Sequence, residues 1–376
     1  MTRKEEPQYF GAGPALLPTS VLEQAARDLL EYKDHGVGVA EISHRSKDAI
    51  AVIDGTKDKI RQLYGVPDTH EIFFAQGGGT GGFAAVAYNL LAAHAARTGR
   101  KGKADYLVTG SWSKKAAQEA ARLGVDVNIV SDTTGRVPDA DGLKYSLPED
   151  TAYVYYCDNE TVHGVEFPTP PSPPAGVELV ADMSSNFLSR PVDVSRFGLV
   201  FGGAQKNIGI AGVSLYIIKK SLLEHAPDDV LRQLGVPLAP IFLHFPSIVA
   251  NNSAYNTVSI LAVQVVNLVL DHLLAKGGLV AQGDEAQAKA DKVYSVLDRF
   301  PETYETLVEK TSRSRMNIVF KTPDDAAFLA GAEARGLTGL KGHRSVGGIR
   351  VSNYNAVSQN SIDALVSYMV EFANNK

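Results

Sequence analysis

One lysine of this 376-residue chain, Lys206, stands in an unusual setting for a charged side chain. It follows Gly202, Gly203 and Ala204 in the stretch FGGAQKNIG, and an apolar segment begins a few residues later. Surface lysines ordinarily lie among other polar residues, whereas small residues let other atoms approach the backbone closely. The setting indicates an amine that meets a bound molecule.

Three other features could act with this lysine. The segment QGGGTGG (76–82) follows the apolar run EIFFA and opens a predicted helix, where backbone N–H groups can hold a phosphate. It lacks the spacing of the nucleotide-binding glycine motifs, and a plain tight turn is the alternative. Asp182 ends the apolar run VELVAD, where a carboxylate is costly unless it is paired; a helix cap is the alternative. Trp112, the only tryptophan, follows the run ADYLVTG and is either a core side chain or a flat surface for a ligand ring.

A single cofactor uses all of these features together. Pyridoxal 5′-phosphate (PLP) needs an amine for a Schiff base, an acid opposite its pyridine nitrogen, a surface that stacks on its ring and a cradle for its phosphate. In α/β proteins such groups gather at the carboxyl ends of strands. The joint pattern predicts a PLP-dependent enzyme in which Lys206 and Asp182 are the catalytic groups.

The elements that must position these groups alternate along the first two thirds of the chain. Helical patterns occur at 19–34, 46–65 and 112–124. Between and after them lie apolar runs of strand length, most of them apolar on both faces: EIFFAQ, ADYLVTG, VDVNIVS, TAYVYYC, VELVADM, FGLVFGG and GVSLYIIKK. This alternation predicts an α/β domain with a largely parallel sheet.

The last third of the chain has a different pattern. After an apolar helix at 258–275 and glycines at 277 and 278, a long amphipathic helix is expected at about 281–299, followed by strand, helix, strand and helix. We therefore predict a large domain at 19–277 and a smaller α+β domain at 278–376 that includes residues 1–18. The proline-rich PTPPSPP (168–174) is interpreted as a surface loop, with a domain linker as the alternative.

Composition narrows the class of protein. The net charge of −5 gives no overall attraction to nucleic acid or to an anionic membrane, so an anionic ligand must be met by a local cluster of cations. The single cysteine, Cys157, excludes an internal disulfide and a cysteine-based metal site, so we expect no metal and a reducing, cytoplasmic location. The first ten residues lack the apolar core of a signal peptide. Polar residues interrupt the run at 258–275, which favours a buried helix over a membrane span.

Several longer motifs closely resemble the phosphoserine aminotransferase family. The resemblance runs in order from about residue 9 to the C-terminus, and AQKNIG and KGHRSVGGIR are its most specific blocks. The other matching segments are GAGPALLP, EISHRSK, QGGGTGGFAAV, DYLVTGSWSKKA, DNETVHGVE, ADMSSNFLSRPVDVSRFGLVFGG, SRMNIVF and VSNYNA.

The resemblance implies a fold-type I PLP-dependent transferase with a mainly parallel seven-stranded sheet. It also implies a homodimer with shared active sites. Such an enzyme moves the amino group of L-glutamate to 3-phosphohydroxypyruvate and produces O-phospho-L-serine and 2-oxoglutarate, in the biosynthesis of serine.

The matching motifs also imply roles for individual residues. Lys206 would bind the cofactor covalently, Asp182 would face its ring nitrogen and Trp112 would stack on its ring. Thr161 would bind the ring hydroxyl, and the phosphate would be held by Gly79, Thr80 and Gln205, with Asn256 and Thr257 from the neighbouring subunit. The substrate would be bound by His44, Arg45, His343, Arg344 and Arg350, of which Arg350 would take the α-carboxylate.

One departure and two alternatives accompany this interpretation. Many bacterial relatives carry an arginine where this chain has Thr80, so the substrate phosphate would depend more on Arg45 and Arg344. The nearest alternative is another fold-type I enzyme, such as a small-amino-acid aminotransferase or a cysteine desulfurase. A desulfurase would need a mobile nucleophilic cysteine, whereas Cys157 ends a strand and is expected to be a packing residue. A non-catalytic binding protein on the same scaffold could dispense with Lys206 or Asp182, and both are present.

Overall fold

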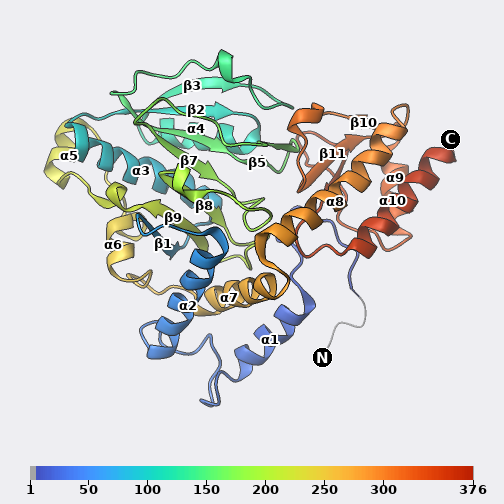
Figure 1. Cartoon of the computed structure of the whole chain (residues 1–376), viewed down its shortest axis with the longest axis horizontal. Coiled ribbons are helices and arrows are strands. Elements are labelled where there is room, and N and C mark those ends of the chain that lie inside the picture. The colour runs from blue at the N-terminus through green and yellow to red at the C-terminus, as the bar shows by residue number, and fades with distance from the viewer. Residues whose placement is uncertain (1–5, 376) are drawn as a thin grey trace.

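The large sheet of the protein lies at the centre of the chain's first two thirds. The computed structural model describes residues 6–375. Seven strands lie in the order β1-β9-β8-β7-β4-β2-β3, and β9 alone runs in the opposite direction to the other six (Figure 1). The prediction of a mainly parallel seven-stranded sheet is confirmed. The strands are β1 (His70–Ala75), β2 (Lys103–Val108), β3 (Asp126–Asp132), β4 (Thr151–Cys157), β7 (Glu178–Asp182), β8 (Leu199–Gly203) and β9 (Ser214–Lys219).

Helices cover both faces of this sheet, which explains why its strands are apolar at both parities. In β1, for example, Ile72 and Phe74 join the core on one face while Phe73 joins the core on the other. The first core is completed by α1 (Thr19–Leu30), α2 (Lys47–Tyr64) and α7 (Ile260–Ala275). The second is completed by α3 (Gly78–Thr98), α4 (Ser111–Arg122), α5 (Asp228–Leu234) and α6 (Phe245–Ala250).

The helix boundaries follow local chemistry. Helix α2 starts after Ser46, whose hydroxyl accepts a hydrogen bond from the Ala49 N–H at 3.2 Å, and it ends at Gly65 in the left-handed conformation. The helix expected at 19–34 is too long, because α1 ends at Leu30. Lys33 and Asp34 have φ of 53° and 56°, which a helix cannot contain.

A second, smaller sheet occupies the last third of the chain. It is antiparallel and contains β10 (Glu305–Thr306), β11 (Asn317–Lys321) and β12 (Ile349–Ser352), with α8 (Gly278–Arg299), α9 (Asp325–Glu333) and α10 (Gln359–Asn374). The two-residue strand β10 was not expected from the sequence.

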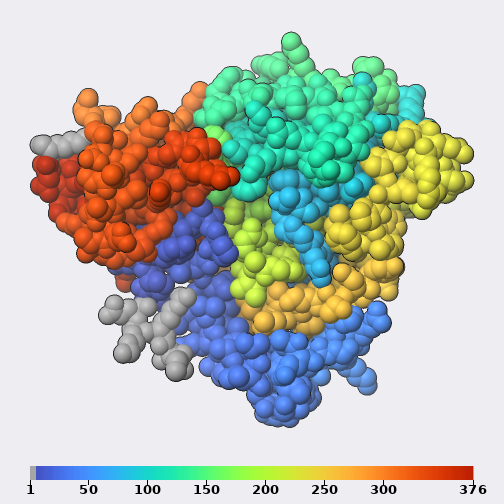
Figure 2. Space-filling view, turned by 180° about the vertical axis from the view of Figure 1, so that it is seen from behind, coloured from blue at the N-terminus to red at the C-terminus, as the bar shows by residue number. Residues whose placement is uncertain are grey.

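The N-terminal segment joins this part of the chain. The Phe10 N–H donates to the Thr338 carbonyl at 2.8 Å, and the Phe10 carbonyl accepts from the Ser352 N–H at 3.2 Å. In the view from behind, blue N-terminal residues lie directly against the orange and red C-terminal part (Figure 2). Phe10 thus joins the smaller domain, whereas Leu17 packs in the first core of the large sheet and the Ala15 N–H donates to the Gln205 carbonyl at 2.9 Å. The grouping of residues 1–18 with the smaller domain and the boundary at 277/278 both stay predictions.

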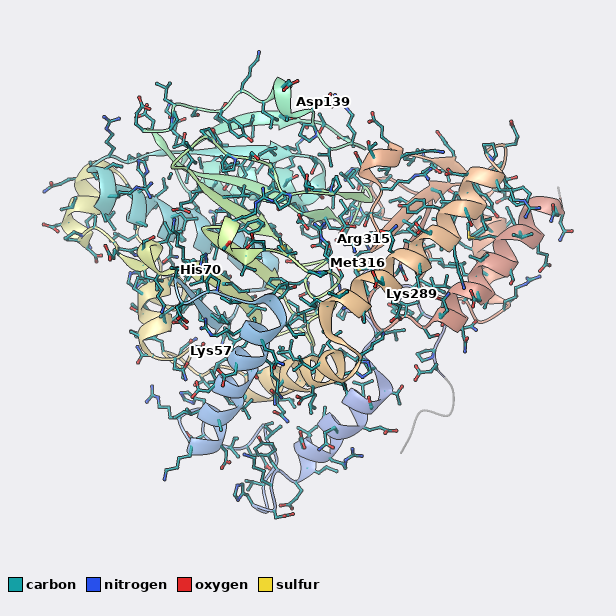
Figure 3. The ribbon with its side chains drawn as sticks, in the orientation of Figure 1. Lys57, His70, Asp139, Lys289, Arg315 and Met316 are labelled. Atoms are coloured by element: carbon teal, nitrogen blue, oxygen red, sulfur yellow. The ribbon has the colours of Figure 1, made fainter. Side chains whose placement is uncertain are left out.

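An ion pair joins the segment that precedes β11 to a separate two-stranded hairpin. Arg315, just before β11, donates to Glu166 through Nη2 at 2.6 Å and through its backbone N–H at 2.8 Å. Glu166 belongs to the short hairpin β5 (Asn159–Glu160) and β6 (Val165–Glu166). Figure 3 labels Arg315 and Met316 in the region between the strands of the central part and α8.

Two smaller expectations can be compared with the structure. The segment 168–174 lies in the irregular connection between β6 and β7, as the surface-loop interpretation predicted. Among residues 6–375, no single helix is long and apolar enough to cross a membrane, and the successive pair α7 and α8 passes such a test only jointly, with an 83° bend between them.

Candidate active site

A cavity lies beside the carboxyl ends of the parallel strands, where the sequence placed its functional groups. It brings together seven residues predicted to bind the cofactor: Gly79, Thr80, Trp112, Thr161, Asp182, Gln205 and Lys206. It is also lined by residues that were not singled out as cofactor ligands: Phe83, Cys157, Asn159, Ser184 and Ser185.

Lys206 extends into this cavity from the turn that follows β8. Its side chain is only 8% exposed, and its amine donates a hydrogen bond to the Thr161 hydroxyl at 2.6 Å. The N-terminal segment packs on its stem, since a Cβ at Gly13 would lie 3.4 Å from Lys206 Cγ. The amine is therefore held at one point of the cavity, and no carboxylate within 4.0 Å neutralises it among the described residues.

Asp182 is the acid at the end of β7. Its Oδ1 accepts two hydrogen bonds from Ser184, from the backbone N–H at 2.8 Å and from the hydroxyl at 2.6 Å. Burial raises the pKa of Asp182, although the Ser184 hydrogen bonds and the charge of Lys206 act in the opposite direction. A protonated ring nitrogen beside this carboxylate would stabilise its ionised form. Ser184 was missed in the sequence, although a serine two residues after an aspartate at a strand end is a common side-chain turn.

The glycine-rich segment forms the start of α3, as expected. Gly77 and Gly78 have φ of 112° and 60°, which favour glycine, and the helix begins at Gly78. A Cβ at Gly79 would lie 3.4 Å from Ser184 Oγ and 3.9 Å from Asp182 Oδ2. The missing side chain leaves backbone N–H groups of a helix N-terminus facing the cavity, which is a suitable site for a phosphate.

Trp112 lies in the first turn of α4 and forms another wall. Its backbone N–H donates to Glu160 Oε2 at 3.0 Å, and its indole Nε1 is buried without a hydrogen-bond partner in residues 6–375. The Lys115 amine lies 4.5 Å from the centre of the indole ring. The wall is thus an aromatic surface that a ligand ring can cover.

These residues fit PLP. They supply a buried amine, a carboxylate that Ser184 binds through one of its two oxygens, an aromatic wall with a buried indole N–H, and a glycine-rich turn at a helix N-terminus. Each of the four requirements stated from sequence is met by a residue that lines the same cavity.

Among the predicted substrate residues, Arg350 is the one that contacts a residue of the cavity. It lies in β12, and its Nη1 donates to the Thr161 carbonyl at 3.4 Å. His343 and Arg344 lie in the preceding loop. Burial and the nearby charges of Arg350 and Arg344 lower the pKa of His343.

The remaining predicted residues do not line the cavity of their own chain. Asn256 and Thr257 are exposed, and the Thr257 carbonyl accepts a hydrogen bond from Gln76 Nε2 at 2.7 Å. Arg45 is exposed, and His44 has a buried Nε2 without a partner in the described part of the chain.

Cys157 has the environment of a packing residue. It is buried at the end of β4, and its Sγ donates to the Asn159 carbonyl at 3.3 Å. Burial raises the pKa of the Cys157 thiol well above its ordinary value, which opposes the thiolate that a nucleophilic cysteine requires.

A larger groove of about 640 Å³ lies elsewhere, between α8 and the segments 166–168 and 310–315, but it lacks these chemical groups. Its arginines are already paired: Arg190 with Asp158 at 2.7 Å, Arg313 with Asp298 at 2.7 Å and Arg315 with Glu166 at 2.6 Å. The smaller cavity around Lys206 is therefore the better candidate for catalysis.

Comparisons with known proteins agree with this geometry. Residues 8–365 match the class-V aminotransferases. Phosphoserine aminotransferase from Saccharomyces cerevisiae is 49% identical over 98% of both chains, and that from Drosophila melanogaster is 44% identical over 97% of this chain and 98% of its own. The PLP-bound crystal structure of phosphoserine aminotransferase from Trichomonas vaginalis superimposes with a TM-score of 0.88 at 39% identity, over 97% of this chain and 99% of its own. The chain therefore belongs to the class-V aminotransferase family and, within it, to the phosphoserine aminotransferases.

Proposed function

We propose that this protein is a PLP-dependent transaminase that transfers the amino group of L-glutamate to 3-phosphohydroxypyruvate, giving O-phospho-L-serine and 2-oxoglutarate. The observation that carries the proposal is the buried Lys206 amine, bound to Thr161 at 2.6 Å in a cavity that also contains Asp182 and Trp112. The reaction would serve the biosynthesis of serine.

Different residues of the chain have different roles in this reaction. When bound, PLP supplies a carbonyl carbon for covalent attachment and a ring that withdraws electrons from the substrate. Lys206 binds the cofactor and, once its amine is free, moves a proton to and from the substrate's α-carbon. Asp182, held by Ser184, keeps the proton on the ring nitrogen. Trp112 covers the ring, and Gly79, Thr80 and Gln205 hold the phosphate.

The substrate is recognised by cations. Both amino-acid substrates carry an α-carboxylate, which we assign to Arg350 because this arginine reaches the Thr161 carbonyl at the edge of the cavity. An arginine fork binds a carboxylate through two parallel hydrogen bonds. His343 and Arg344, with His44 and Arg45 from a partner subunit, would bind the distal anion.

We propose a homodimer, because this assignment needs residues that their own chain does not bring to the cavity. The partner subunit's Asn256 and Thr257 would complete the phosphate site. Exposed apolar side chains support such an interface, since Ile241 is 52% exposed, Phe242 44% and Tyr255 38%. A cytoplasmic location is also part of the proposal, because the single cysteine suits a reducing compartment.

The proposal is tested with the purified protein, PLP and paired substrates. Glutamate with 3-phosphohydroxypyruvate should react faster than glutamate with pyruvate or oxaloacetate, because only the first acceptor carries the distal phosphate. Borohydride reduction followed by peptide mapping should label Lys206, and Lys206→Ala should lose the covalent label. Labelling of a different lysine, or equal rates for all acceptors, would contradict the assignment.

A further inference from the structure

The hairpin that supplies Thr161 also contacts the start of α4 through a buried carboxylate. Glu160 is 0% exposed and accepts three hydrogen bonds from the first turn of that helix. The Trp112 N–H donates to Oε2 at 3.0 Å, whereas the Ser113 N–H and hydroxyl donate to Oε1 at 2.8 Å and 2.6 Å. Oε2 thus accepts from Trp112, whereas Oε1 accepts both hydrogen bonds from Ser113.

Close packing fixes this carboxylate in place. A Cβ at Gly110 would lie 2.6 Å from Glu160 Cδ and 2.8 Å from His163 Nδ1, so any side chain at position 110 would displace both groups. The Ser111 N–H donates to the same His163 nitrogen at 3.3 Å. Successive amides of the helix start are therefore bound by side chains of one hairpin.

Two opposing effects act on the charge of this carboxylate, because burial raises the pKa of Glu160 while the hydrogen bonds from Ser113 and Trp112 act in the opposite direction. Exposed N–H groups and the helix dipole favour an anion at a helix N-terminus, and the three hydrogen bonds replace the water that Glu160 has lost. The next residue, Thr161, accepts the hydrogen bond from Lys206. Two consecutive residues of the hairpin thus hold the aromatic wall and the amine of the same cavity.

We propose that Glu160 is a positioning residue for the cofactor site: its carboxylate fixes the Trp112 backbone, and thereby the indole, at the orientation that covers the cofactor ring. The proposal rests on the proposed function. It differs from a purely stabilising helix cap, which would raise the stability of the fold without changing the indole.

The hydrogen-bonding pattern provides a selective variant. In Glu160→Gln the two Ser113 donors keep the single amide oxygen, so the amide NH₂ faces the Trp112 N–H and two donors oppose each other. Ser113→Ala is the matched control. It removes the 2.6 Å hydrogen bond to Glu160 and the acceptor used by the Thr109 and Gly110 N–H groups, yet it leaves the Trp112 N–H bound.

Trp112 itself reports the result, because it is the only tryptophan of the chain. Acrylamide quenching of its fluorescence is measured in cofactor-free protein, and Trp112→Phe supplies the background. We expect Glu160→Gln to raise the quenching constant about threefold and to weaken PLP binding roughly tenfold, as loss of a hydrogen bond to a charged group would do. Ser113→Ala should change the quenching constant and the PLP affinity less than twofold, although its melting temperature should fall as much as that of Glu160→Gln.

Equal quenching and equal PLP affinity in Glu160→Gln and the parent protein would overturn the proposal, as would equal changes in Glu160→Gln and Ser113→Ala. If Glu160→Gln does not fold, Glu160→Asp is used, which keeps the charge but withdraws it by one methylene. A folded Asp variant with unchanged Trp112 quenching would also overturn it. The quenching does not depend on transamination, so failure of the proposed function would appear separately, as a parent protein that does not bind PLP.

Discussion

Ser184→Ala should slow the reaction by removing half of the support for Asp182. The Ser184 hydroxyl donates to Asp182 Oδ1 at 2.6 Å, and its removal would leave the Ser184 backbone hydrogen bond to the same oxygen at 2.8 Å. A hydrogen bond to a charged group contributes about 1.5–3 kcal/mol, and each 1.36 kcal/mol of a barrier is tenfold in rate. Since burial already raises the pKa of Asp182, loss of this donor shifts the pKa further in the same direction. We expect a rate lower by roughly ten- to a hundredfold.

The assay is a single turnover of PLP-loaded protein with glutamate, followed by absorbance. Ser189→Ala is the control, because this buried serine donates to the Asn186 carbonyl at 2.6 Å in the same segment but does not contact Asp182. Ser184 Oγ also accepts from the Gly203 N–H at 3.1 Å, so Ser184→Ala should lose stability as well, by about 1–3 kcal/mol. Rates are therefore compared at equal amounts of bound cofactor. A Ser184→Ala variant as fast as Ser189→Ala would refute the role of Ser184, and Ser184→Thr should recover most of the rate.

Three further predictions concern other parts of the molecule. Arg45→Ala and Arg344→Ala should weaken the binding of phosphoserine more than that of glutamate, because a phosphate carries about −1.5 to −2 charge and a carboxylate −1, whereas Arg350→Ala should weaken the binding of both alike. Affinities for each substrate are measured in single turnovers, and equal losses of affinity in Arg45→Ala and Arg344→Ala would place the phosphate site elsewhere. Diluting the protein should release PLP as dimers separate, which sedimentation and absorbance follow together, and a monomer that keeps PLP would contradict the shared site. Burial lowers the pKa of Lys289 to about 8, so below this pH the native state contains a poorly solvated cation, and as pH rises towards 10.5 the native state releases a proton that the unfolded chain keeps. Wild-type stability relative to Lys289→Met should therefore increase by up to about 3 kcal/mol across this range in urea titrations, and a constant difference would refute the shift.

Much of the fold could be predicted because its strands are covered on both faces. Runs such as TAYVYYC and FGLVFGG are apolar at every position that meets a helix layer, and β4 and β8 coincide with them. The end of α1 could not be predicted, because the positive φ values of Lys33 and Asp34 have no distinct local signal. The two-residue strand β10 exists only through its pairing with β11.

The candidate site likewise contains residues that could be predicted from the sequence and residues that could not. Lys206 and Trp112 each follow a strand and Asp182 ends one, so their convergence could be predicted from the order of elements. Glu160 could not be found in this way, because its partners are 47 and 48 residues away in sequence and on another element. The substrate-binding roles assigned to His44 and Arg45 stay predictions, as do the phosphate-binding roles assigned to Asn256 and Thr257 of a second subunit, since none of these residues lines the cavity of its own chain.

The hairpin at 158–166 explains how buried charge and catalytic geometry are combined. A buried carboxylate costs several kcal/mol unless hydrogen bonds or cations replace its water, and this short segment contains three of them. Their donors come from several elements: Asp158 binds Arg190 and Asn186, and Glu160 binds the start of α4. Glu166 binds Arg315 of the C-terminal part and shares Asn186 with Asp158. Burial alone would raise the pKa of Glu166, but the charges of Arg315 and Arg190 lower it below its ordinary value. Thr161 lies between these carboxylates in the sequence, and it binds the Lys206 amine through its hydroxyl and Arg350 through its carbonyl. The hairpin therefore fixes three groups relative to one another: the amine, the aromatic wall and the arginine proposed for the α-carboxylate.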